Sequence, residues 1–216
     1  AAWLLTHLHW DHIGLATSFI GKYASGVTIE KLVYNFPTYS YALDDPDFNA
    51  SWYKGLLTTF DSTVKDTLKA SQIITPHTGQ VLKFGDVEVE IMYTHEDLLP
   101  LPCDKVNNTS TVFKLTVAGQ TILFGGDLED KGSQICVAMN GSALKSDIVQ
   151  VTHHGYTGAS KDYYLKAEPV VLLWPIDANL SQLTGSITKA LINSTSIKKH
   201  IVAVDGIITI TLPYLP

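Results

Sequence analysis

Apolar residues in the first third of the chain change their spacing, and the change separates strands from helices. Short apolar runs of about four to eight residues predict buried strands, whereas apolar residues three and four positions apart predict helices. A stretch rich in Pro, Asp, Tyr and Asn interrupts the pattern and predicts a long loop. The expected elements are a strand at residues 1–6, a helix at 13–24, a strand at 27–36, the loop at 37–50 and a helix at 51–70.

The rest of the chain contains runs of alternating apolar and polar residues, which are typical of strands in hairpins. Glycine-containing pairs separate these runs, and the pair Asp205-Gly206 has the chemistry of a type I′ turn. Hairpins in two groups with helices between them indicate two sheets with the helices outside. The expected elements are hairpins of residues 81–84 with 87–93, 111–117 with 121–124 and 200–204 with 207–212, helices at 129–140, 160–167 and 182–193, and strands at 147–152 and 170–174.

The composition is that of an ordinary globular protein. The chain has 216 residues, of which 45% are apolar and 17% are charged, and no linker, repeat or low-complexity tract divides it. We therefore expect a single domain over residues 1–216. Two cysteines, Cys103 and Cys136, are too few for a disulfide scaffold, and one bond between them stays an open alternative.

Charge and hydropathy restrict the expected partners. The net charge is −6 and all 15 basic residues are lysine, which argues against a large nucleic-acid surface without excluding one. No apolar run reaches the roughly 18 residues of a membrane span, so we expect no transmembrane segment. The chain starts at Ala1 without a recognisable signal peptide, which predicts a mature form or an internal fragment. A secreted or cell-surface location is favoured over the cytoplasm, and the oligomeric state is open.

The strongest chemical pattern is His7-x-His9-x-Asp11-His12, between the first strand and the first helix. In an extended segment, side chains two residues apart point the same way, so His7 and His9 can bind one metal ion together. The turn into the helix can direct Asp11 and His12 toward a second ion. Neutral imidazole and carboxylate are good ligands for zinc, iron or manganese. The sequence therefore predicts two divalent metal ions, with zinc the first choice and manganese or iron as alternatives.

Two further polar groups follow strands later in the chain. Asp127 comes directly after two glycines, which let the backbone approach a site where a carboxylate can bridge two ions. A plain turn is the alternative explanation for this Gly-Asp pair. His153 and His154 follow the strand expected at residues 147–152. Because adjacent strand residues face opposite ways, one histidine is expected to complete the second metal site and the other to contact substrate.

Taken in order, His-x-His-x-Asp-His, the later Gly-Asp and the final His resemble the metallo-β-lactamase superfamily over nearly the whole chain. The resemblance implies an α/β fold, namely a four-layer αβ/βα sandwich with a binuclear metal site at one edge of its two sheets. The superfamily normally has strands before the first motif, and this chain begins at the motif strand. We therefore expect a metallo-β-lactamase-like sandwich without its first strands.

Three local segments resemble one branch of that superfamily. Asn107-Asn108-Thr109-Ser110 is similar to the Asn-Asn-x-Ser segment of DNA-internalisation competence proteins. His153-His154-Gly155 and the closing Asp205-Gly206-Ile207-Ile208 resemble the same branch. The phosphorylcholine esterases of choline-decorated bacteria are relatives within it.

The resemblance implies a role for each matching residue. His95 is the only histidine near the place where the superfamily usually offers a further ligand to the first metal, so it is a candidate ligand or substrate contact. We expect His77 in a loop and His200 in a structural position. The implied roles are His7 and His9 as ligands of the first ion, Asp11, His12 and His154 (or His153) as ligands of the second, Asp127 as the bridge, and Asp11 and His153 as catalytic residues.

The function implied by the resemblance is hydrolysis by a metal-bound hydroxide at the binuclear site. The expected substrate is a phosphoric ester, either a phosphodiester or a phosphorylcholine ester, as a small molecule or in a cell wall. The alternatives are an accessory metal-binding domain of a larger assembly without turnover, and a lactone or β-lactam hydrolase. Aromatic residues could line a substrate pocket with Trp10 at its mouth, although Trp52 and Phe60 could instead be helix core. The pocket candidates are Tyr39, Tyr41, Phe48, Trp52 and Tyr53.

Overall fold

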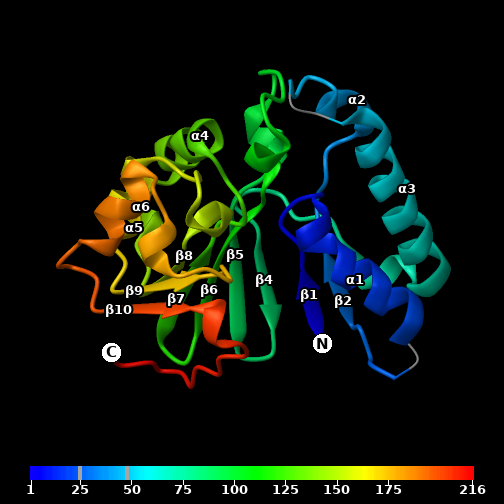
Figure 1. Cartoon of the computed structure of the whole chain (residues 1–216). Coiled ribbons are helices and arrows are strands. Elements are labelled where there is room, and N and C mark those ends of the chain that lie inside the picture. Colours follow the sequence, from blue (N-terminus) through cyan, green and yellow to red (C-terminus); the bar gives the residue numbers. More distant parts are fainter. Residues whose placement is uncertain (24–25, 47–48) are drawn as a thin grey trace.

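The computed structural model describes residues 1–23, 26–46 and 49–216, which form two β-sheets (Figure 1). The small sheet is parallel and has the strand order β1-β2-β3, and the large sheet is mixed and has the order β10-β9-β8-β7-β6-β5-β4. The strands are β1 (Ala2–Leu4), β2 (Lys31–Val33), β3 (Ile73–Ile74), β4 (Val81–Phe84), β5 (Val87–Tyr93), β6 (Val112–Val117), β7 (Gln120–Phe124), β8 (Ile148–Gln150), β9 (Val171–Trp174) and β10 (Lys199–Val202).

Helices cover the outer face of each sheet, so the molecule has four layers. Figure 1 shows α1 and α3 outside the small sheet and α4, α5 and α6 outside the large one. This arrangement confirms the α/β sandwich expected from the sequence. The helices are α1 (Trp10–Tyr23), α2 (Tyr39–Ala42), α3 (Ala50–Thr67), α4 (Asp130–Asn140), α5 (Lys161–Ala167) and α6 (Ser186–Ile192), and the 3₁₀ helices are η1 (Ala70–Gln72), η2 (His95–Leu98), η3 (Val106–Thr109), η4 (Gly141–Leu144), η5 (Thr152–Gly155), η6 (Leu180–Gln182) and η7 (Ala203–Asp205).

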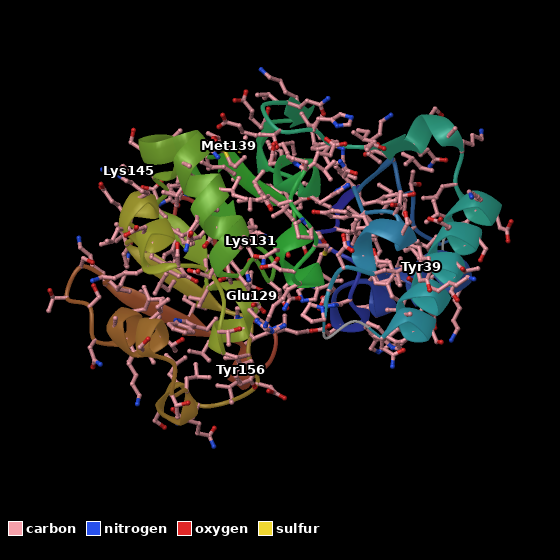
Figure 2. All side chains as sticks on the ribbon, turned by 90° about the horizontal axis from the view of Figure 1, so that it is seen from above. Tyr39, Glu129, Lys131, Met139, Lys145 and Tyr156 are labelled. Carbon is pink, nitrogen blue, oxygen red and sulfur yellow. The ribbon has the colours of Figure 1, made fainter. Side chains whose placement is uncertain are left out.

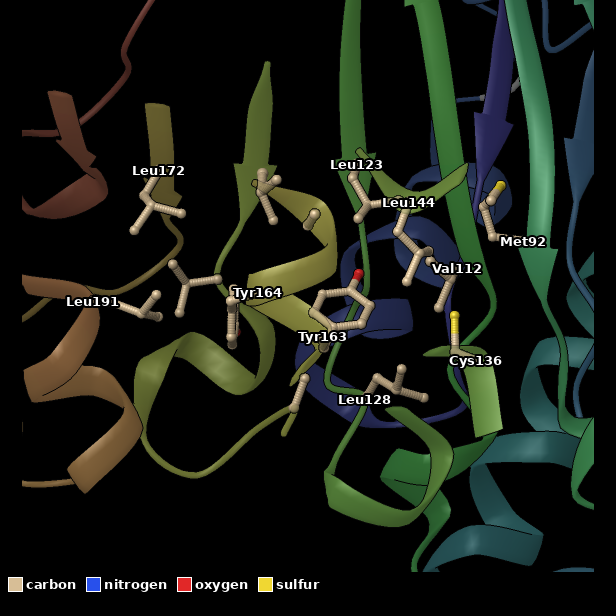
Figure 3. Packing of buried hydrophobic residues seen from close by; sticks show 14 of the residues in the cluster. Met92, Val112, Leu123, Leu128, Cys136, Leu144, Tyr163, Tyr164, Leu172 and Leu191 are labelled. Carbon is tan, nitrogen blue, oxygen red and sulfur yellow. The ribbon is translucent and has the colours of Figure 1, made fainter. Parts of the chain in front are cut away.

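The core of the large sheet holds three of its parallel strands in register. Leu123 of β7 pairs in register with Val149 of β8, which pairs with Leu172 of β9. All three side chains are buried together with Tyr163 of α5 in the cluster that Figure 3 shows. Burying a side chain of this size contributes roughly 1.5–3 kcal/mol to stability. Because β7, β8 and β9 are parallel, their carboxyl ends meet at one edge of the sheet.

Several predicted elements are confirmed, among them the hairpins β4–β5 and β6–β7. The first helix begins earlier than predicted, at Trp10 rather than residue 13. The carbonyl of His9 accepts hydrogen bonds from the backbone N–H groups of His12 and Ile13, so the helical turn starts inside the metal motif. The strand predicted at residues 27–36 is reduced to β2, and the predicted loop at 37–50 contains α2.

The predicted final hairpin is wrong. β10 pairs in parallel with β9 and is followed by η7, and no strand is found at residues 207–212. Ile207 is fully exposed and Ile208 is 42% exposed, so the apolar alternation of this segment has no sheet to pack against. Residues 203–205 form η7 and Gly206 has a ψ of −143°, which differs from a type I′ turn, so the chain does not fold back along the outer edge of β10.

Two other expectations concern the cysteines and the membrane. Cys103 and Cys136 are buried free thiols in two different hydrophobic clusters, so the open disulfide alternative is not realised. Across the residues that the structure describes, we find no helix with the length and apolar character of a membrane span.

Candidate metal centre

The connection from β1 to α1 places the first motif at the edge where the two sheets meet. His7 is fully buried in this connection, and Asp11 and His12 lie in the first turn of α1. The hydroxyl of Thr6 lies 3.1 Å from Nδ1 of His7 and 3.4 Å from Nδ1 of His12. The hydroxyl group thereby orients both rings and leaves their Nε2 atoms available for other partners.

The turn after β7 holds Asp127 against the same connection. Gly126 has a φ of +55°, and a β-carbon on it would lie 2.7 Å from the side chain of Thr6, so the position requires glycine. The buried side chain of Gln150 accepts hydrogen bonds from the backbone N–H groups of Gly125 and Gly126 at 3.0 and 2.9 Å. Ser110, the last residue of the Asn-Asn-x-Ser segment, accepts from the backbone N–H of Asp127.

A strained turn after β8 separates the two adjacent histidines. His153 and His154 have φ values of +49° and +55°, in the left-handed region that costs energy for residues with a β-carbon. Nδ1 of His154 donates a hydrogen bond of 2.6 Å to the carbonyl of Pro175, which follows β9. This bond fixes the tautomer of the ring and directs Nε2 toward the carboxylates of Asp11 and Asp127, at 3.2 and 3.6 Å.

Four of the predicted ligands form one compact group: Asp11, His12, Asp127 and His154 each offer a ligand atom within 4.8 Å of all the others. Nε2 of His12 lies 3.1 Å from Oδ2 of Asp127, yet Nε2 of His12 and Oδ1 of Asp127 are both buried and form no hydrogen bond. Buried polar atoms are normally hydrogen-bonded, so these two unpaired atoms are what a metal-binding site would be expected to contain. Two carboxylates and two imidazoles fit a divalent ion such as zinc.

His7 and His9 lie beside this group as a second pair of ligand atoms. Nε2 of His7 is 3.0 Å from Nδ1 of His9, and the His7 ring centroid is 4.3 Å from that of His12. Burial and the neighbouring imidazoles hold the pKa of His7 well below its usual value, so the ring is neutral, as a metal-binding imidazole must be. Two nitrogens bound to one tetrahedral zinc ion lie about 3.3 Å apart, which is close to the spacing of this pair.

The charges of the group are strongly coupled. Hydrogen bonds to Asp11 and Asp127 raise the pKa of His154 to about 11. The same histidine holds the pKa of Asp11 down to about 2. Burial would raise the pKa of Asp127, but the close approach of the His12 and His154 rings outweighs it and lowers that pKa far below its usual value. Both carboxylates are therefore ionised at neutral pH, as metal ligation requires.

A sequence model of the metallo-beta-lactamase superfamily matches residues 1–172, which include every predicted ligand. The chain belongs to the metallo-beta-lactamase superfamily. Members of this superfamily are generally hydrolases and typically hold divalent metals in a binuclear site. The donor groups described above agree with that property.

The chain is similar to one curated protein, ComE operon protein 3 from Bacillus subtilis (strain 168). The two sequences are 24% identical over 165 residues. The match covers 76% of this chain and 18% of that protein, so the chain spans less than a fifth of the relative's length. This relative supports the branch expected from the Asn-Asn-x-Ser segment.

Solved structures share the superfamily fold. A mutant of the CmlA beta-hydroxylase has a TM-score of 0.50 at 14% identity, over 80% of this chain and 35% of that chain. CmlA itself is a diiron beta-hydroxylase from Streptomyces venezuelae. Igni18, a metallo hydrolase from Ignicoccus hospitalis, has a TM-score of 0.49 at 14% identity, over 93% of this chain and 75% of that chain. At 14% identity, the match to the CmlA mutant shows the fold alone.

His153, the other predicted catalytic residue, lies outside the group of four ligands. Its Nδ1 is 2.6 Å from the hydroxyl of Thr157 and 3.3 Å from Oε1 of Glu129. Glu129 also accepts a hydrogen bond from the amide of Asn107, and it is 9% exposed. Although burial would raise its pKa, the contacts with His153 and Asn107 lower the pKa of Glu129 to about 2. In Figure 2 Glu129 lies near the middle of the view, between the two halves of the molecule.

Sequence reasoning did not single out Thr6, Glu129 or Gln150. Glu129 stands two residues after Asp127, so its spacing from the bridging aspartate was the only local indication available. Gln150 is a buried polar residue inside an apolar strand, and such residues usually need a specific hydrogen-bonding reason. Thr6 carries no pattern that distinguishes it from an ordinary strand residue.

The remaining predicted histidines lie elsewhere. Nδ1 of His95 is 3.2 Å from the carbonyl of Asn35, and burial lowers the pKa of this ring. It does not belong to the group of four ligands. His77 pairs with Glu96 at 2.7 Å on the surface, and the ring of His200 accepts a hydrogen bond from the indole of Trp174.

The predicted aromatic pocket divides into separate parts. Tyr53 and Phe60 are fully buried in the core beneath α3, whereas Trp52 is 44% exposed and its ring lies 5.9 Å from that of His9. Tyr41 donates to the carbonyl of Leu101, away from the ligands. Tyr39 lies on the α3 side in Figure 2, and Phe48 lies outside the described residues.

Proposed function

We propose that this chain is a metal-dependent hydrolase of phosphoric esters, acting on a phosphodiester or a phosphorylcholine ester. The observation that carries the proposal is the group of four converging ligands, in which buried atoms of His12 and Asp127 have no hydrogen-bond partner. A group that had lost its metal function would be expected to pair or replace such atoms, because an unpaired buried polar atom costs about 1–3 kcal/mol.

The predicted ligands are assigned to two metal ions. His7 and His9 would hold one ion, Asp11, His12 and His154 would hold the other, and Asp127 would contact both. Two bound divalent ions supply charge neutralisation for the ester oxygens and lower the pKa of a shared water. Zinc is the first choice for these ligands, with manganese and iron as alternatives.

His153 is proposed to donate a proton to the leaving group. Its ring is anchored through Nδ1 by Thr157 and Glu129, and such anchoring holds a catalytic imidazole in one orientation. Asp11, which is 59% exposed, is proposed to orient the nucleophile as well as to bind metal.

The choice of a phosphoric ester rests on the branch of the superfamily. The relative ComE operon protein 3 supports that branch, and the Asn-Asn-x-Ser segment packs directly against the Asp127 turn. Because the chain has no arginine, recognition of a phosphate would depend mainly on the charge of the bound metal.

The test is hydrolysis of bis(4-nitrophenyl) phosphate by protein loaded with zinc or manganese. The wild type is expected to turn over this ester, and Asp127→Asn is expected to lose at least about 10²-fold in kcat. His77→Asn, at a surface histidine outside the ligand group, is the matched control and is expected to retain full activity. Equal activity of Asp127→Asn and the wild type would refute the proposal, whereas metal binding without turnover would favour an accessory domain. Turnover of a lactone or β-lactam, with no phosphodiester cleavage, would assign the other hydrolase class.

A further inference from the structure

A groove of about 320 Å³ lies between α1 and α3, beside the first motif. Trp10 and Ile13 line it from α1, and Trp52, Gly55 and Leu56 line it from α3. The remaining lining residues are serine and threonine, so no charged side chain lines this groove among the described residues.

Two exposed tryptophans form the walls of the groove. Trp10 is 58% exposed and Trp52 is 44% exposed, which is unusual for the largest apolar side chain. The Trp10 ring packs flat against α1, since a β-carbon on Gly14 would lie only 2.8 Å from it. Asn49 caps α3 by accepting a hydrogen bond from the backbone N–H of Trp52, and this bond fixes the start of the helix. One face of the Trp10 ring is thus covered by α1, while both tryptophans keep a large exposed surface.

The groove lies beside the candidate metal centre, and two of its lining residues adjoin the predicted ligands. The rings of Trp52 and His9 are 5.9 Å apart, within the range of an aromatic pair. Trp10 directly precedes Asp11, one of the four converging ligands.

The chemistry of the groove lining favours an uncharged aromatic ring as its occupant. Tryptophan faces stack well on planar aromatic groups, and bases stacked on aromatic side chains gain about 1–3 kcal/mol each. A cationic group would also be attracted to tryptophan, but among the described residues no carboxylate lines the groove to add to that attraction. The volume lies near the lower end of the roughly 300–1,000 Å³ seen for ligand pockets, which suits a single ring system.

We propose that the groove between Trp10 and Trp52 is a specificity subsite that binds an uncharged aromatic ring of the substrate, adjacent to the ester at the metal centre. The identity of the ester part rests on the proposed function, whereas the ring-binding property of the groove does not.

Gly55 allows the groove to be filled without disturbing the fold. A β-carbon at this position would meet no atom within 4 Å, so Gly55→Leu places its side chain in open space. Leucine is also a better helix former than glycine, so α3 is retained. Thr58→Leu is the matched control, because Thr58 is an exposed residue of the same helix outside the groove lining.

The experiment compares binding of phenylphosphonate and methylphosphonate to zinc-loaded protein by calorimetry. Wild type and Thr58→Leu are expected to bind phenylphosphonate about tenfold more tightly than methylphosphonate, as one stacked ring predicts. In Gly55→Leu the ratio is expected to fall to about one, with the affinity for methylphosphonate unchanged. A ratio of one in the wild type, or a preserved ratio in Gly55→Leu, would overturn the subsite.

A neutral aromatic probe tests the subsite independently of the proposed function. Binding of benzyl alcohol to protein without added metal is followed by ligand-observed NMR, and choline is added as a competitor. If neither phosphonate binds but benzyl alcohol binds the wild type and not Gly55→Leu, the subsite stands and the ester hydrolase proposal fails. Absence of benzyl alcohol binding, or its displacement by equimolar choline, would contradict an uncharged aromatic occupant.

Discussion

Replacing Gln150 with leucine tests how the candidate centre is built. The side chain of Gln150 accepts hydrogen bonds from the N–H groups of Gly125 and Gly126, and it donates to the carbonyls of Gly126 and Val151 at 2.9 Å each. It is 8% exposed, so water cannot replace these partners without a rearrangement. Leucine has a similar volume but no polar atoms. The substitution therefore removes the hydrogen bonds while leaving the packing nearly unchanged.

The magnitude follows from the two N–H groups that lose their acceptor. Each buried, unpaired group costs about 1–3 kcal/mol, so Gln150→Leu is expected to lower the free energy of unfolding by about 4 kcal/mol. The released turn carries Asp127, so metal affinity should also fall. The control is Ile148→Val, on the same face of β8, which should cost only about 0.5–1.5 kcal/mol and leave metal binding unchanged.

Urea unfolding followed by circular dichroism measures the stability change, and calorimetric titration with zinc measures the affinity. A loss below about 1 kcal/mol for Gln150→Leu, with unchanged zinc affinity, would refute the reasoning. It would mean that the turn after β7 is held by other contacts.

Three further predictions concern residues around the same centre. His154 has a folded-state pKa raised to about 11, so its stabilising effect on ligand-free protein is complete below pH about 6.5 and is lost as the pH rises through 11. Zinc binding at pH 7.5 should accordingly release about one proton more from the wild type than from His154→Asn, and equal release in calorimetry across two buffers would contradict this. His153→Ala should lower kcat by about 10²–10⁴-fold without changing the metal content, and a loss of metal would instead make this histidine a ligand. Gly126→Ala should lower the melting temperature more than Gly79→Ala, because both have positive φ but only Gly126 approaches Thr6, and equal shifts would exclude the contact as the cause.

The parts of the site that the sequence could predict are those with short spacing. The first motif spans only six residues, which are His7, His9, Asp11, His12 and the two residues between them. Its side chains are therefore close together wherever the strand ends. Asp127 and His154 were recognisable because glycine and histidine follow apolar strands, although their meeting depends on the parallel order of β7 and β8. Their side chains converge as the pattern indicated, and their role as ligands remains a prediction.

The features of the site and fold that the sequence did not predict depend on contacts between segments that are distant in the chain. Gln150 reaches residues more than twenty positions earlier in the chain, and Glu129 reaches His153 in the same way. No local pattern encodes such contacts. The final hairpin prediction failed because Asp205-Gly206 has turn chemistry in sequence, whereas the chain there forms η7 and, within the described residues, leaves the outer edge of β10 unpaired. Trp52 sits in an apolar helical pattern, yet its ring points toward His9 rather than into the core beneath α3.

The central claim is that these side chains hold metal, and the most direct test is the metal content of the protein. Plasma mass spectrometry of protein purified without chelator is expected to give about two equivalents of zinc, manganese or iron per chain. No bound metal, and no uptake when these ions are added to the folded protein, would contradict the account.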